Sequence, residues 1–392
     1  MKDVVILGGM RTPMGEYNGA LSDFSAIDLG VIAAKAALQK TGVAPDEIHH
    51  AVFGNALQTS GDAIYGARHV ALKSGLPVSV PALTVNRLCG SGIQSIVEAA
   101  HLIQMDDAEI VLAGGMESMS QAPHVIRGLR KGLRLGEGQL EDMLMVALMD
   151  TCCGFYMAQT SDNLSREQSI GREEQDAYAM RSQRAAAAAW EAGKFKDEIV
   201  PVEIRSRKGT IFFDRDDHMR PDSTLEGLAA LKPHFSKDGF VTAGNASGIV
   251  DGAAAIVVCS AREAERRQAK PLGRIVSWGY AGVEPRIMGM GPVPAVQNAL
   301  KKARLTLSDM ELIEINEAFA GQYLAVEKML GLDREKVNVN GGAIALGHPL
   351  GATGTRLVLT LLLELRRRNK KVGLASACIG GGQGIAMIVE AF

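Results

Sequence analysis

The sequence has almost no net charge and no long hydrophobic run. Its 392 residues include 42 lysines and arginines against 44 aspartates and glutamates, for a formal charge of −2. A nearly neutral chain has no overall field that attracts nucleic acid or a membrane surface. No apolar stretch approaches the roughly 18 residues of a membrane-spanning helix. We therefore expect neither a nucleic-acid partner nor a membrane partner.

Cysteine is scarce, and its spacing does not suit a metal. The five cysteines are an odd number and form no zinc pattern; they stand at positions 89, 152, 153, 259 and 378. This usage predicts free thiols in a reducing compartment, with no disulfide framework and no metal site. Residues 1–7 pass directly into an apparent strand, without a signal peptide or a basic presequence. We expect a location in the bacterial cytoplasm or, in a eukaryote, the mitochondrial matrix.

Short apolar runs alternate with segments of helical period, which predicts an α/β architecture. The length allows two or three domains with a large core. In the first half the expected elements are strands at 4–7, 51–53 and 110–113, and helices at about 26–40 and from about 89.

The second half repeats this pattern. Residues 37–40 correspond to 299–302, and residues 110–115 to 375–381. The final strand, from Gly384, corresponds to one from Gly252 that lies far beyond residue 115 in the first half. We therefore predict two similar halves related by a pseudo-twofold axis, with an insertion in the first; chance similarity between α/β segments is the alternative.

The insertion defines the predicted domains. An N-terminal domain comprises residues 1–118 and 250–271, an inserted loop domain residues 119–249, and a C-terminal domain residues 272–392. A long insertion in a compact α/β unit is usually a lid or a binding subdomain.

Cys89 is the first candidate for catalysis. It follows the apolar run at 82–85 and precedes Ile93, Ile96 and Val97, which recur at helical spacing. A cysteine at a helix N-terminus faces unpaired backbone N–H groups, which can lower a thiol pKa from about 8.5 to roughly 3.5–7.5. We expect a nucleophile at neutral pH; a buried, inert cysteine is the alternative.

Two further glycine-rich clusters carry candidate groups. His348 lies between Gly347 and Gly351 at the start of a helix, in the counterpart of the Cys89 position. Cys378 precedes Gly380 and its neighbouring glycines directly after a strand, where backbone N–H groups could form an oxyanion hole. A tight hairpin or a phosphate loop is the alternative, although neither phosphate-loop pattern fits.

Asn316 ends another apolar strand, where it serves either the site or a helix cap. Two thiols, an imidazole and a carboxamide permit a specific chemistry. Cys89 would take up an acyl group while His348 accepts its proton. Cys378 would act as general base on a carbon acid, and Asn316 would stabilise an enolate together with backbone N–H groups. A Cys-His-Asn hydrolase has similar residues but leaves Cys378 without a role.

Six motifs resemble those of the thiolase family over essentially the whole chain: NRLCGSG at 86–92, GGMESMS at 114–120, TAGNASG at 242–248, NEAFA at 316–320, GGAIALGHPLGATG at 341–354 and CIGGGQG at 378–384. Within the family, the sequence of these motifs looks most similar to that of the mitochondrial-type 3-ketoacyl-CoA thiolases. The biosynthetic acetyl-CoA acetyltransferases are second in similarity. The resemblance implies a five-layered αβαβα fold of two similar halves, a loop domain over the site, and a homotetramer built as a dimer of dimers.

The resemblance also implies a reaction and roles. The reaction is the reversible CoA-dependent cleavage of 3-ketoacyl-CoA to acetyl-CoA and acyl-CoA. Cys89 resembles the acyl-accepting nucleophile, His348 its activator and Cys378 the acid/base at the acetyl methyl. Asn316 resembles the residue that holds the water of the enolate hole, and the N–H groups of Cys89 and Gly380 resemble the second oxyanion hole.

Coenzyme A is implied as a substrate, with no permanently bound cofactor. The positions that match CoA contacts and the walls of the pantetheine tunnel are Arg220, Ser247, Met157, Ala243, Ala318 and Phe319. Biosynthetic members usually have histidine at the position of Tyr156 and serine at that of Gly227, which argues against a strictly biosynthetic enzyme. An enzyme restricted to acetoacetyl-CoA synthesis and a non-catalytic CoA or lipid carrier are the alternatives.

Overall fold

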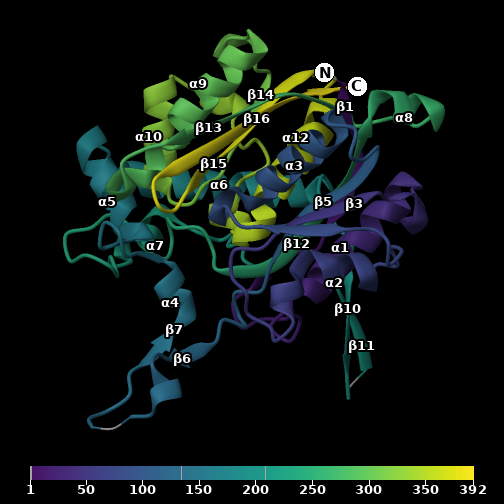
Figure 1. Cartoon of the computed structure of the whole chain (residues 1–392). Helices are drawn as coiled ribbons and strands as arrows, with labels where there is room; N and C mark the ends of the chain where they lie inside the picture. The colour runs from purple at the N-terminus through teal and green to yellow at the C-terminus, as the bar shows by residue number, and fades with distance from the viewer. Residues whose placement is uncertain (1, 134, 208) are drawn as a thin grey trace.

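The computed structural model describes residues 2–133, 135–207 and 209–392 (Figure 1). Within these ranges, ten strands form one sheet, in the order β14-β15-β16-β13-β1-β12-β5-β3-β4, with β2 beside β12. The strands are β1 (Val4–Arg11), β2 (Gly15–Glu16), β3 (His50–Gly54), β4 (Ala82–Val85), β5 (Ile110–Glu117), β12 (Val250–Ser260), β13 (Gly273–Gly282), β14 (Leu312–Ile315), β15 (Val372–Ile379) and β16 (Gln383–Ala391).

The two ends of this sheet repeat one strand order, as the sequence predicts. β1, β12, β5 and β3 in the first half correspond to β13, β16, β15 and β14 in the second. β3 pairs in parallel with β5 and β4, and β14 pairs in parallel with β15 and, by a single bridge, with Val337. The halves join through the pairs Val5–Arg274 and Ile6–Gly273 of β1 and β13.

The helices cover both outer faces and separate the halves. α1 and α2 pack on strands of the first half, α9 packs on β13 and β16, and α3 and α12 pack on each other between the halves (Figure 1). Ile93 and Ile96 of α3 share one hydrophobic core with Leu357 and Leu361 of α12. The helices are α1 (Ala26–Thr41), α2 (Gly66–Lys73), α3 (Ser91–Gln104), α8 (Ala261–Arg266), α9 (Pro292–Ala303), α10 (Ala320–Leu330), α11 (Ala343–Leu346) and α12 (Leu350–Arg367).

Two glycines allow α3 and α12 to approach closely. A Cβ atom at Gly92 would lie 2.4 Å from the backbone N of Thr355, and one at Gly354 would lie 2.3 Å from that of Ile93. Any larger residue would push the helices apart. Because α3 starts just after Cys89 and α12 just after His348, this contact brings both turns to the centre of the molecule.

The segment between β5 and β12 contains helices α4 (Met143–Ala147), α5 (Met157–Gln168), α6 (Arg172–Glu191) and α7 (Leu225–Ala230). Two of its hairpins extend away from the body of the molecule in Figure 1, β6–β7 (His124–Ile126 and Leu140–Asp142) and β10–β11 (Val202–Ser206 and Gly209–Phe213); a third is β8–β9 (Met149–Asp150 and Phe155–Tyr156). Across the described ranges, no helix combines the length and apolar character needed to cross a membrane.

Candidate active site

Cys89 lies on a sharp turn between β4 and α3. The turn is a single 3₁₀ segment, Leu88–Gly90, in which Leu88 adopts the left-handed conformation with φ of 45°. Asn86 Oδ1 accepts the N–H of Leu88 at 2.9 Å, and Ser91 Oγ accepts the N–H of Arg87 at 2.8 Å. A non-glycine residue in this conformation is strained, and such strain is typical of functional turns. The helix start predicted near Cys89 is confirmed.

The low thiol pKa expected for Cys89 is wrong. Although its side chain reaches a cavity, surrounding protein atoms remove most of its solvation, and this burial raises the pKa of the thiol to about 12. The N–H groups of Gly380 and of Cys89 itself oppose the shift, but do not overcome it. Desolvation disfavours the charged thiolate more than these dipoles stabilise it. The resting nucleophile is therefore a neutral thiol that needs a base.

His348 supplies a neutral imidazole. It follows Gly347, whose φ is 95°, on the turn between α11 and α12, and its N–H donates to the backbone oxygen of Gly248 at 2.9 Å. The side chain is buried, and burial lowers the pKa of His348 to about 3, with the guanidinium of Arg356 acting in the same direction. The ring is thus unprotonated at neutral pH and able to accept a proton.

The hydrogen bonds of the ring identify its tautomer. Nδ1 lies 2.6 Å from Oγ1 of Thr353, and that hydroxyl donates its own proton to the backbone oxygen of Pro349 at 3.1 Å. Oγ1 therefore accepts from Nδ1–H, which leaves the lone pair on Nε2. Asn316 Nδ2 lies 3.2 Å from Nε2 on the opposite side.

Asn316 belongs to the site and not to a helix cap. It follows β14, whereas α10 begins at Ala320 and is preceded by Phe319 at the N-cap. The Asn316 side chain is fully buried, and its Oδ1 has no hydrogen-bond partner among the described residues. A buried acceptor without a donor is costly, so this oxygen can accept a hydrogen bond from a polar group that comes beside His348.

Cys378 lies near the end of β15, behind the wall of the same cavity. It is fully buried in a cluster with Met288 and Ala318. Burial raises the pKa of the Cys378 thiol, and the charge of the Cys89 sulfur raises it further, so the two sulfurs lie close enough to interact. Directly after Cys378, Gly381 and Gly382 adopt φ values of 80° and 81°. These conformations favour glycine and form the turn that carries the Gly380 N–H to Cys89.

The inner cavity has two connected parts, because several residues line both. One part, of about 70 Å³, contains Cys89, His348 and Gly380; the other, of about 130 Å³, contains Tyr156 and Phe235. The residues that line both parts are Leu148, Met157, Ser247, Phe319, His348 and Leu350. The predicted residue Ala318 lines the first part.

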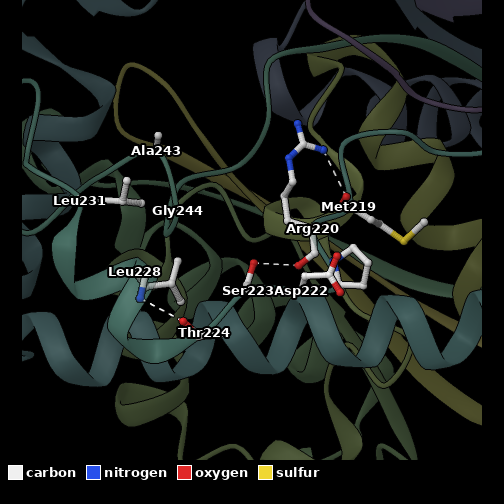
Figure 2. Close-up of a pocket in the computed structure, with 11 residues that line it drawn as sticks. Met219, Arg220, Asp222, Ser223, Thr224, Leu228, Leu231, Ala243 and Gly244 are labelled. Atoms are coloured by element: carbon white, nitrogen blue, oxygen red, sulfur yellow. Dashed lines mark hydrogen bonds between the residues drawn. The ribbon is translucent and has the colours of Figure 1, made fainter.

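A larger outer cavity, of about 580 Å³, lies among the residues of the insertion (Figure 2). Its walls include Arg220, Leu228, Leu231 and Ala243. The Arg220 guanidinium is half exposed and donates to Glu16 at 2.5 Å. Residues 243–249 reach from this cavity to the inner one, because Ala243 lines the outer cavity while Ser247 lines the inner one.

The structure thus brings the predicted residues together in two groups. Cys89, His348 and Gly380 line the inner cavity with Met157, Ser247, Ala318 and Phe319, while Arg220 and Ala243 line the outer one. Asn316 and Cys378 are buried directly behind the inner cavity, Asn316 against His348 and Cys378 against Met288 and Ala318. Sequence reasoning missed Thr353, which contacts His348, and the apolar wall formed by Leu148, Met288 and Leu350. The position of Thr353 five residues after His348, in the first turn of α12, was the available signal.

This arrangement suits covalent acyl transfer with a carbon acid. A thiol next to a neutral base provides a nucleophile, and N–H groups at its sulfur can hold a developing oxyanion. A second thiol at the same cavity supplies another proton-transfer group. Among the described residues, no cluster of three or more histidine, cysteine, aspartate or glutamate side chains is placed to hold a metal ion.

Known proteins match the chain along its whole length. The family model for the thiolase N-terminal domain matches residues 4–262, and the model for the thiolase C-terminal domain matches residues 269–391. The human protein named 3-ketoacyl-CoA thiolase, mitochondrial, is 53% identical over 100% of this chain and 98% of its own length. An acetyl-CoA acetyltransferase of Cupriavidus necator is 50% identical over 100% of both chains.

Solved structures give the same result. The crystal structure of human mitochondrial 3-ketoacyl-CoA thiolase in complex with CoA has a TM-score of 0.97 and 52% identity, covering 100% of this chain and 98% of that one. The Bacillus anthracis acetyl-CoA acetyltransferase has a TM-score of 0.98 and 46% identity, covering 100% of this chain and 99% of that one.

Proposed function

The chain belongs to the thiolase family, and we propose that its acyl transfer proceeds through a thioester on Cys89. Its activity is that of a 3-ketoacyl-CoA thiolase or acetyl-CoA acetyltransferase, with coenzyme A as a substrate. The observation that carries the residue assignment is that one thiol and one neutral imidazole line a single cavity, while a second thiol from the other half lies directly behind its wall.

In the first step of cleavage, the Cys89 sulfur attacks the 3-keto carbon while Nε2 of His348 accepts the thiol proton. A pKa of about 12 for Cys89 and about 3 for His348 makes a free ion pair unfavourable before attack. Proton transfer therefore accompanies bond formation. The bond between C2 and C3 of the substrate then breaks, which leaves the acyl group on Cys89 and the enolate of acetyl-CoA.

Cys378 completes this step by donating its thiol proton to the enolate carbon, which gives acetyl-CoA. Burial makes the Cys378 thiolate a strong base once formed, so it readily takes the proton of incoming CoA. The CoA sulfur attacks the thioester and releases acyl-CoA, while Nε2 of His348 returns its proton to the departing Cys89 sulfur and so regenerates both groups. Asn316 Oδ1 would hold a water that helps His348 stabilise the enolate, and the N–H groups of Cys89 and Gly380 would hold the acyl oxygen.

Coenzyme A would lie across the insertion. Arg220 and Ala243 would contact its outer part, and Ser247, Met157, Ala318 and Phe319 would line the tunnel for the pantetheine arm. We propose that this role belongs to an inserted loop domain at 119–249, between the two parts of the N-terminal domain, 1–118 and 250–271, with a C-terminal domain at 272–392. The helix contacts support five alternating layers, with α3 and α12 as the central one.

A degradative range of substrates fits this chain better than acetoacetyl-CoA alone. Tyr156 occupies the place where biosynthetic enzymes usually have histidine, and the inner cavity extends beyond Cys89 by about 130 Å³. Following the resemblance of the motifs to those of the thiolase family, we also propose a homotetramer built as a dimer of dimers. We propose a location in the bacterial cytoplasm or mitochondrial matrix because relatives carry bacterial and mitochondrial names.

Two measurements test the proposal. Purified protein should cleave acetoacetyl-CoA only with free CoA, and Cys89→Ala should abolish the reaction while leaving the fold intact. Hydrolysis of acyl-CoA without a CoA acceptor, or an active Cys89→Ala variant, would contradict it. A kcat/KM series over 3-ketoacyl-CoA chain lengths tests the substrate range, since an acetoacetyl-specific enzyme shows a sharp decline beyond four carbons.

A further inference from the structure

We infer that Glu117 and Glu317 are positioning residues that hold the two ends of the His348 turn. Glu117 comes from the end of β5 in the first half, and Glu317 follows β14 in the second. Both side chains are fully buried, and neither contacts the inner cavity's thiols by a hydrogen bond among the described residues. This inference rests on the proposed role of His348 as the base.

Glu317 fixes the turn on its N-terminal side. Its Oε2 accepts the N–H of Ile344 at 3.2 Å, four residues before His348. The glutamate approaches so closely that a Cβ at Gly342 would lie 2.3 Å from its Cδ. The same carboxylate accepts Tyr178 Oη at 2.7 Å and Ser182 Oγ at 2.6 Å from α6 of the insertion.

Glu117 fixes the turn on its C-terminal side. Its Oε2 accepts the N–H of Gly351 at 2.8 Å, three residues after His348. It also accepts the N–H groups of Ala56 and Leu57 at 3.1 and 2.9 Å, and Asn55 Nδ2 at 2.7 Å. Burial raises the pKa of Glu117 to about 7, while these backbone N–H groups act in the opposite direction and stabilise the carboxylate.

The hydrogen-bond donors at both positions suit a carboxylate. Each oxygen of Glu117 faces two N–H donors, and each oxygen of Glu317 faces at least one, from Asn338 Nδ2 or Ile344. An amide would turn an NH₂ group towards one of these donors and leave both unpaired. A glutamine with its oxygen at the Oε1 position would lose the N–H of the turn, and one with its oxygen at the Oε2 position would lose the donors that anchor the side chain. Either orientation therefore weakens the hold on one end of the turn while changing the side-chain volume very little.

The test compares Glu117→Gln and Glu317→Gln with Glu198→Gln as a matched control. Glu198 is also buried, but it pairs with Arg11 and Thr360 and touches no residue of the His348 turn. Each test variant should lower kcat by about 10- to 100-fold with KM for CoA within about twofold, because small misplacement of a catalytic group has effects of this size. The rate of alkylation of Cys89 by iodoacetamide should fall by a factor similar to the fall in kcat.

A double-mutant cycle separates this role from a general loss of stability. Because the two carboxylates hold one turn, the Glu117→Gln/Glu317→Gln double variant should lose little more kcat than the worse single variant. If the two substitutions acted independently, the fold-loss of kcat in the double variant would instead equal the product of the two single losses, within about twofold. The inference would be overturned if the two losses of kcat multiplied in the double variant, or if folded single variants kept the kcat of the parent. It would also be overturned if Glu198→Gln, with the same melting temperature as the test variants, lost as much kcat as they do.

Milder variants decide the matter if the glutamines do not fold. Tyr178→Phe removes one donor to Glu317 and retains the stacking of the ring on Tyr323, 4.1 Å between centroids. It should lower kcat a few-fold and slow Cys89 alkylation, and no change in either would overturn the inference for Glu317. His348→Asn distinguishes a failure of the proposed base from a failure of the positioning role. An active His348→Asn enzyme would refute the proposed base. An inactive His348→Asn enzyme, together with fully active glutamine variants, would refute only the positioning role.

Discussion

Oγ1 of Thr353 accepts the Nδ1 proton of His348 across 2.6 Å while donating its own proton to the backbone oxygen of Pro349. This single hydroxyl therefore keeps Nε2 unprotonated, so that Nε2 can act as the base. Thr353→Val removes the acceptor, so the other tautomer becomes accessible, and we expect kcat to fall by about 10- to 100-fold. Thr353→Ser, which retains the hydroxyl, should keep most of the activity. Equal activities of the valine and serine variants, measured by steady-state cleavage of acetoacetyl-CoA, would contradict this assignment.

Cys378→Ser should separate the two proton transfers. A serine hydroxyl is a far weaker acid than a thiol, so exchange of the acetyl-CoA methyl protons with deuterated water should slow by more than about 100-fold. The rate at which labelled acyl-Cys89 forms in a rapid-quench experiment should fall only a few-fold. Cys259→Ser is the matched control, because Cys259 is also buried but lies on β12 in a different hydrophobic cluster. Equal slowing of both steps would show that the roles are divided wrongly.

The buried His348 should make the protein less stable in acid. Its pKa is lowered to about 3 in the folded state from an ordinary value of 6.5, so below pH 6.5 the unfolded chain binds a proton that the folded chain does not. Stability is therefore lost as the pH falls from 6.5 towards 3. Between pH 7 and pH 5 this one group should lower the free energy of unfolding by about 2 kcal/mol.

Denaturant unfolding at both pH values measures this effect. His348→Gln should lose about 2 kcal/mol less than the parent between pH 7 and pH 5. The same substitution at the exposed His124 should behave like the parent. An identical pH dependence in parent and His348→Gln would mean that the ring is protonated in the folded protein.

Arg220 should act on CoA binding and not on the chemical steps. Its half-exposed guanidinium lines the outer cavity, where it could pair with an anionic group of CoA. Arg220→Ala should raise KM for CoA by about tenfold with kcat at saturating CoA within about twofold. Arg205→Ala, on the exposed hairpin β10–β11, provides the control. A fall in kcat with unchanged KM would place Arg220 in the chemistry instead.

Tyr156 should limit the length of the acyl chain. Its ring contacts that of Phe235, with centroids 5.2 Å apart, at the wall of the inner cavity. Tyr156→Ala enlarges this space, so the ratio of kcat/KM for a ten-carbon over a four-carbon substrate should rise severalfold, since each buried methylene contributes about 0.8 kcal/mol. Tyr156→Phe retains the ring and should leave the ratio unchanged. A ratio that is unaffected by the alanine would exclude this wall from chain-length selection.

The order of elements, the internal repeat and the candidate groups of the site could be predicted from the sequence alone. These follow from local properties: hydrophobic period, the glycine turns around His348 and Cys378, and the motifs that resemble those of thiolases. The helix start near Cys89 and the strand before Cys378 are confirmed for this reason. The place of the insertion was visible because the strands that flank it have counterparts in the second half.

The protonation state and orientation of these groups depend on contacts that form only in the folded chain. The pKa of Cys89 rises where a helix N-terminus alone would lower it, because desolvation in the folded chain outweighs the N–H groups of Gly380 and of Cys89 itself. The tautomer of His348 depends on one threonine hydroxyl, and the contacts of Glu117 and Glu317 join residues more than a hundred positions apart, such as Gly351 and Tyr178. Such contacts leave no periodic signal in the sequence, since they arise only when the two halves and the insertion pack together.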